Sequence, residues 1–67
     1  MYGAFILRQN GSVAMDVYSE ILEDLKAFVD ERFSGIKAGQ SIGVWQMDED
    51  GNFSDLSQGA SILYKQK

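Results

Sequence analysis

The sequence contains no cysteine, no histidine and no proline among its 67 residues. Without cysteine there is no disulfide framework, no thiolate nucleophile and no cysteine metal site. Without histidine the commonest general base and transition-metal ligand is missing, which excludes serine–histidine catalysis and the usual zinc sites. We therefore expect a protein that is not an enzyme, with no catalytic residues, no cofactor and no bound metal.

Long hydrophobic runs are also missing. The longest is Ala4–Leu7, which is far too short to span a bilayer. The N-terminus shows no basic region followed by an apolar one, so we expect no signal peptide. Small secreted domains usually need disulfides, so their absence favours a cytoplasmic location. The formal net charge of −4 argues against direct binding to nucleic acid or to an anionic membrane.

The overall composition is typical of a folded protein, with 45% hydrophobic and 24% charged residues. Residues 1–67 show no repeat, linker or low-complexity tract and are expected to form a single small domain. A domain of this size buries only about 60% of its unfolded surface. The core is therefore expected to be thin, which favours association with a second copy or with another protein.

The clearest local pattern predicts an amphipathic helix between residues 21 and 33. Apolar side chains recur there at the spacing of one helix face. They are Ile21, Leu22, Leu25, Phe28, Val29 and Phe33. Ser19 or Asp16 is expected to cap the start of this helix. If Asp16 is the cap, the segment before it is a short strand or no strand at all.

Four segments around this helix are predicted to be strands. They are Tyr2–Gln9, Ser12–Val17, Ser41–Met47 and Ala60–Lys65, with Phe53 as the possible start of a short return strand. Asn10-Gly11 favours a hairpin in which both residues take positive φ, and it sets Ile6 opposite Met15. The expected fold class is α+β: a small antiparallel-rich sheet in the order ββαββ with one amphipathic helix packed on one face. The alternative order is βαββ, without a strand at 12–17.

Three of the predicted strands are apolar on both faces, whereas a single helix covers only one face. The side chains expected to face the helix include Ile6, Val13, Met15 and Val17. Those expected on the opposite, open face are Phe5, Leu7, Trp45 and Met47. An exposed apolar patch that contains tryptophan usually marks an interface. The alternatives are that the polar segment Ser54–Gly59 folds over this patch, or that these residues lie singly at the rim of the sheet.

Acidic side chains gather on and just before the predicted helix. They are Glu20, Glu23, Asp24, Asp30 and Glu31. This acidic face is either a solvated surface or a mimic of nucleic-acid phosphates. Asp48–Gly51 carries carboxylates and a glycine at calcium-loop spacing, but Gln46 and Ser57 stand where carboxylate ligands are required. We therefore expect an acidic turn there and no metal site.

Together these features favour a non-enzymatic protein-binding module that self-associates, as a homodimer, through an apolar sheet face, or binds another protein there. One alternative is an acidic inhibitor that occupies the nucleic-acid-binding surface of a partner protein. Another is a small-ligand module at a dimer interface, in which the glycines of 35–43 and Gly59 allow a ligand to approach. Small acidic chains without motifs are also common among phage or bacterial accessory proteins.

Overall fold

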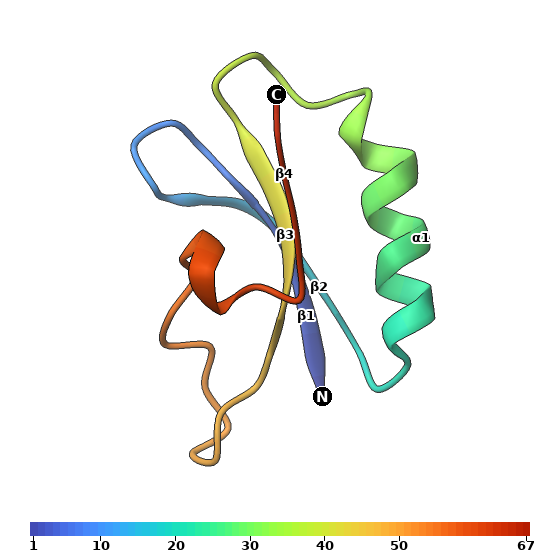
Figure 1. The fold of residues 1–67 in the computed structure, drawn as a ribbon, viewed down its shortest axis with the longest axis vertical. Coiled ribbons are helices and arrows are strands. Elements are labelled where there is room, and N and C mark those ends of the chain that lie inside the picture. Colours follow the sequence, from blue (N-terminus) through green and yellow to red (C-terminus); the bar gives the residue numbers. More distant parts are fainter.

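A computed structural model describes all 67 residues as a four-stranded antiparallel sheet with a single α-helix on one face (Figure 1). The elements are β1 (Tyr2–Leu7), β2 (Val13–Ser19), α1 (Leu22–Phe33), β3 (Ser41–Gln46), the 3-10 helix η1 (Gln58–Ala60) and β4 (Leu63–Gln66). The strands lie in the spatial order β2-β1-β3-β4, so β2 and β4 are the two edges. The α+β class and the order ββαββ are confirmed, and the presence of β2 excludes the βαββ alternative.

α1 packs on the sheet through a narrow apolar stripe. Leu25 and Val29 are almost completely buried and belong to a core cluster with Ala4, Ile6, Ile36, Ile42 and Val44. Leu22, Phe28 and Phe33 are half-buried at the margin of this cluster. The helical spacing therefore predicted the buried face of α1 correctly over residues 22–33.

The start of α1 differs from the expectation. Ile21 is an extended residue ahead of the helix, and 58% of its surface is exposed, so its predicted place in the buried stripe is wrong. The hydroxyl of Ser19 accepts a hydrogen bond of 3.0 Å from the N–H of Ile21 and so turns the chain before the helix begins. Asp16 lies within β2 and does not cap α1.

The hairpin between β1 and β2 has the expected residue pairing but a different loop from the one predicted. Only Gly11 takes a positive φ, of +88°, and the N–H of Gly11 donates to the carbonyl of Arg8, which makes a three-residue loop. A bulge between Ile6 and Leu7 then shifts the register by one residue. The two deviations offset each other, and Ile6 does lie opposite Met15.

The bulge also changes which face Val13 occupies. Met15 and Val17 pair with Ile6 and Ala4 and share their helix-facing side, as predicted. Val13 pairs with Leu7 and therefore points to the opposite side, so its predicted helix-facing position is wrong. One extra residue in a strand exchanges the faces of all the residues beyond it.

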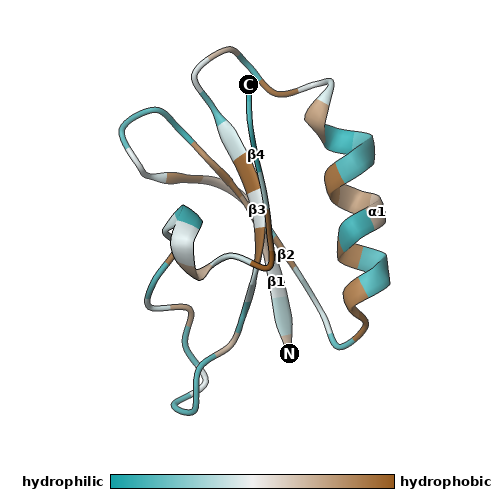
Figure 2. Cartoon of the chain, in the orientation of Figure 1, coloured by the Kyte–Doolittle hydropathy of each residue, from teal (hydrophilic) through white to brown (hydrophobic).

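The chain itself covers the face opposite α1. Figure 1 shows the connection between β3 and β4, in orange, with η1 on the side of the sheet away from the helix. This connection is largely hydrophilic, whereas hydrophobic residues concentrate in the strands (Figure 2). It contains no strand, so the short return strand expected at Phe53 is absent. The molecule thus has three layers: α1, the sheet and this connection.

Candidate functional site

The structure brings together the residues predicted as an open interface but does not leave them exposed. Trp45 and Phe5 lie on the same face, since Trp45 pairs with Gly3 and Phe5 with Gly43. Phe5, Leu7 and Trp45 form a second core cluster and are only 4%, 7% and 2% exposed. Met47 is half-buried at the edge of this cluster. The prediction that these side chains share the face opposite α1 is therefore correct, and the prediction that this face is open to solvent is wrong.

The connection covers this face with two apolar side chains and one hydrogen bond. Phe53 and Leu56 pack on the second cluster, with the ring of Phe53 centred 5.2 Å from that of Phe5. The indole Nε1–H of Trp45 donates to the carbonyl of Ser57 at 2.9 Å. The sequence signal for this cover is weak, because Phe53 and Leu56 are isolated apolar residues in a polar segment without strand or helix periodicity.

The acidic residues do not form an uninterrupted negative surface. All five are exposed. Glu20 pairs with the N-terminal ammonium group at 3.3 Å, Glu23 with Lys26 at 3.5 Å, and Asp30 with Lys65 at 3.0 Å. Three of the five carboxylates therefore face a basic group, which reduces the likeness to a row of phosphates.

The acidic turn uses Asp48 to hold its own backbone. The carboxylate of Asp48 accepts hydrogen bonds from the N–H groups of Asn52 and Asp50 and from the hydroxyl of Ser54. These donors, the N–H of Asn52 first and the hydroxyl of Ser54 next, hold the pKa of Asp48 below its usual value of 3.8. No group of three or more acidic residues is arranged to hold a metal ion.

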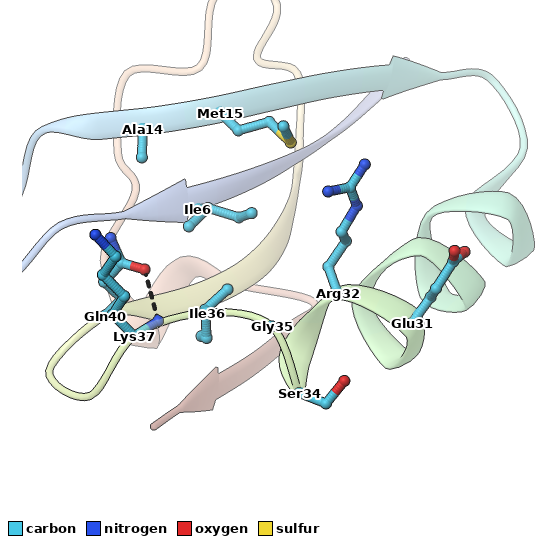
Figure 3. A pocket seen from close by; sticks show the side chains of 10 residues that line it. All are labelled: Ile6, Ala14, Met15, Glu31, Arg32, Ser34, Gly35, Ile36, Lys37 and Gln40. Atoms are coloured by element: carbon cyan, nitrogen blue, oxygen red, sulfur yellow. Dashed lines mark hydrogen bonds between the residues drawn. The ribbon is translucent and has the colours of Figure 1, made fainter.

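The glycines proposed to admit a ligand do not converge on one place. Gly43 lies under the indole of Trp45, Gly39 occupies a turn with φ of +88°, and Gly59 lies in η1 with open space around it. Gly35 lines a groove of about 450 Å³ between the C-terminal end of α1 and the β1–β2 hairpin. Figure 3 shows the Arg32 side chain extending from α1 toward β2 beside this groove, which Glu31 also lines.

The candidate site is the outer edge of β2, where no further strand pairs. Six large apolar side chains are markedly exposed, and four of them lie in β2 or immediately after it. These four are Val13, Met15, Tyr18 and Ile21, with exposed fractions between 38% and 58%. Asp16 is the only charged residue of β2. Exposed apolar side chains along an unpaired strand are typical of a site for another chain.

The hydrogen bonds on the two sides of β1 show which backbone N–H and C=O groups of β2 point away from the sheet. The N–H of Met47 donates to the carbonyl of Met1, and the N–H of Arg8 donates to the carbonyl of Ser12. Because strand amides alternate in direction, the even-numbered residues of β1 turn their backbone groups toward β2. Their partners Met15, Val17 and Ser19 bond to β1, so the N–H and C=O groups of Asp16 and Tyr18 point outward.

Asp16 and Tyr18 are also joined through their side chains. The hydroxyl of Tyr18 donates to the Asp16 carboxylate at 2.7 Å, and this hydrogen bond raises the pKa of Tyr18 above its usual value of 10.0. The Tyr18 ring packs edge-on against Phe5, with centroids 5.8 Å apart. The two residues that present the outward backbone groups are therefore held in place on the strand.

The other edge of the sheet is protected. β4 has four residues and carries Lys65, with Lys67 just beyond it. Lys65 binds Asp30, and the ammonium group of Lys67 donates to the carbonyls of Ser34 and Phe33 at the end of α1. Short length and lysines are the usual means of discouraging strand addition at an edge. β2 has neither, and sequence reasoning missed it because edge position depends on the spatial order of the strands.

Comparison with protein-family models, with curated proteins and with solved structures gives no match to this chain. α1 is neither long nor apolar enough to cross a membrane. The most distinctive feature of the chain is the exposed edge of β2, which is longer than β4 and carries no lysine.

Proposed function

We propose that this protein is a non-enzymatic protein-binding module that takes up an extended segment of another chain beside β2. In this mode of binding the added segment continues the sheet, and backbone hydrogen bonds supply much of the affinity. The outward N–H and C=O groups of Asp16 and Tyr18 are the pairing groups for such a segment. The binding surface is thus the edge of the sheet and not the face formed by Phe5, Leu7 and Trp45, which the chain covers.

Two grooves flank β2, one on each face of the sheet. The groove of about 450 Å³ on the helix side is lined by Met15 and Ala14 of β2. A groove of about 490 Å³ on the opposite side is lined by Val13 and Tyr18. Side chains of an added strand alternate between the two faces, so successive residues point into one groove and then the other. This arrangement gives a partner segment side-chain contacts as well as backbone hydrogen bonds.

The observation that carries this proposal is the contrast between the two edges. β4 is short and its lysines are bound to α1, whereas β2 has seven residues, one charge, and exposed apolar side chains on both faces. Natural proteins usually blunt an exposed strand edge. β2 has only the bulge at Ala14 and the charge of Asp16, which leave the outward backbone groups of Asp16 and Tyr18 as a template for pairing.

The test is selection of displayed random nonapeptides against the wild type, followed by binding measurements on Asp16→Pro and Asp16→Ala. Proline removes the outward N–H of residue 16 but no hydrogen bond to β1, and edge strands tolerate proline in that orientation. Alanine removes the same charge and keeps the N–H. We expect selected peptides to bind the wild type and Asp16→Ala, and to bind Asp16→Pro about tenfold more weakly or worse.

Circular dichroism and thermal unfolding of both variants establish that they are folded. If no peptide is selected, or if folded Asp16→Pro binds the selected peptides as well as Asp16→Ala does, strand addition at β2 is contradicted.

A further inference from the structure

We infer that the segment that β2 receives is β2 of a second copy of this chain, in a two-fold symmetric dimer whose axis passes beside Val17. This inference rests on the proposed function, because it names the partner of the same edge. In a symmetric antiparallel pair one residue of the strand lies opposite its own copy, and all other pairs follow from that choice. The sequence of β2 allows the possible central residues to be compared.

Like charges exclude two of these central residues. A pair centred on Asp16 sets the two Asp16 carboxylates directly opposite each other. A pair centred on Tyr18 sets Asp16 of each copy opposite Glu20 of the other copy. Directly opposed like charges destabilise a strand pair. The bulge at Ala14 excludes a pair centred on Met15, because it needs outward backbone groups at Ala14, where the strand is distorted.

A pair centred on Val17 avoids both problems. Asp16 then lies opposite Tyr18 of the second copy, and these are the two residues whose backbone groups point outward. The phenol that already donates to Asp16 within one chain then also lies beside the Asp16 carboxylate of the other copy. The two Val17 side chains meet on the helix-facing side, where Val17 already packs against the core.

Beyond the paired residues this register brings Glu20 of one copy toward the groove on the helix side of the other copy. That groove is lined by Arg32 and Lys37 and also by Glu31, so two basic groups and one acidic group face the incoming carboxylate.

The absence of cysteine allows a direct test of this register by cross-linking. In the proposed dimer the two residues at position 17 form a non-hydrogen-bonded pair with Cα atoms about 4.5 Å apart, which a disulfide spans. The two residues at position 15 are displaced by four residues along the strands, or about 13 Å, which a disulfide does not span. Val17→Cys and Met15→Cys are therefore matched variants on the same face of the same strand.

We expect mild oxidation to convert Val17→Cys rapidly into a disulfide-linked dimer and Met15→Cys at least about tenfold more slowly. Sedimentation is expected to show a wild-type dimer and a monomer for folded Asp16→Pro. Equal cross-linking of the two cysteine variants overturns the register. A wild type that stays monomeric at all concentrations overturns self-association.

Failure of this inference is distinguishable from failure of the proposed function. If the wild type is monomeric but selected peptides still lose affinity for Asp16→Pro, β2 binds a different chain, and only the second-copy partner is wrong. If the peptides also fail to discriminate between Asp16→Pro and Asp16→Ala, both proposals are wrong.

Discussion

The indole Nε1–H of Trp45 lies 2.9 Å from the carbonyl oxygen of Ser57 and donates a hydrogen bond to it. This bond joins β3 to the segment that covers the sheet face opposite α1. Trp45 is only 2% exposed, and its ring lies edge-on to both Phe5 and Tyr64. The tryptophan is therefore part of the monomer core.

Trp45→Ala is expected to destabilise the monomer by about 3–5 kcal/mol, the usual cost of removing a large buried aromatic side chain. The measurement is the free energy of unfolding from urea denaturation followed by circular dichroism. A variant with unchanged monomer stability and weakened association would instead place Trp45 in an interface between chains.

Gly43→Ala is expected to destabilise the fold by about 1–3 kcal/mol, the range for overpacking a core. An added Cβ would lie 2.7 Å from Cη2 of Trp45 and 2.8 Å from the backbone oxygen of Leu63, which cannot move aside without disturbing β4. Gly59→Ala is the control, because the space around Gly59 is open and its φ is not positive. Equal unfolding free energies for the two variants would contradict the packing of Trp45 on Gly43.

Leu25→Ala is expected to cost about 2–5 kcal/mol, because Leu25 is 1% exposed at the centre of the contact between α1 and the sheet. Ile21→Ala, which changes the exposed residue ahead of the helix, is expected to stay within about 0.5 kcal/mol of the wild type. Chemical denaturation of the two variants measures the difference. A larger loss for Ile21→Ala than for Leu25→Ala would mean that the helix presents another face to the sheet.

The turn at Asp48 is expected to contribute stability that depends on pH. Folding lowers the pKa of Asp48 from 3.8, so the folded state favours the charged carboxylate. The contribution is therefore fully present above the unfolded pKa and is lost as the pH falls through the lower, folded pKa. Asp48→Ala should unfold at a lower temperature than the wild type near neutral pH, and this gap should shrink in strong acid. A gap that grows on acidification would contradict the role of the charged Asp48 carboxylate in this turn. Asp50→Ala is the control, because it removes a carboxylate from the same turn and leaves the hydrogen bonds to Asp48 in place.

The sequence predicted the elements whose side chains repeat with a regular period. The stripe of Leu22, Leu25 and Val29 predicted α1. The short apolar runs around Ile6 and Trp45 predicted two of the strands, and the two-residue period of a strand predicted which of their side chains share a face. These patterns depend on neighbours three or four residues apart in a helix and two apart in a strand. For this reason the fold class and the order of the elements followed from local information.

The sequence offered the cover of the second face by residues 54–59 only as an alternative, which the structure confirms, and it gave no sign of the exposed edge. Phe53 and Leu56 reach the sheet from an irregular segment, where no period marks a residue as buried. The bulge that turns Val13 to the other face lies in a pairing between two strands. The exposure of β2 depends on β3 pairing with β1 and not with β2, which is a property of the whole sheet.

Amide hydrogen exchange along β2, measured by NMR over a range of protein concentrations, tests the central claim most directly. The amides of Met15 and Val17 point toward β1 and are expected to be protected at every concentration. Those of Asp16 and Tyr18 point outward and are expected to exchange rapidly in dilute solution and to become protected as the concentration rises and β2 pairs with its copy. Outward amides that exchange at the rate of fully exposed groups at all concentrations would contradict pairing of this edge with a second copy.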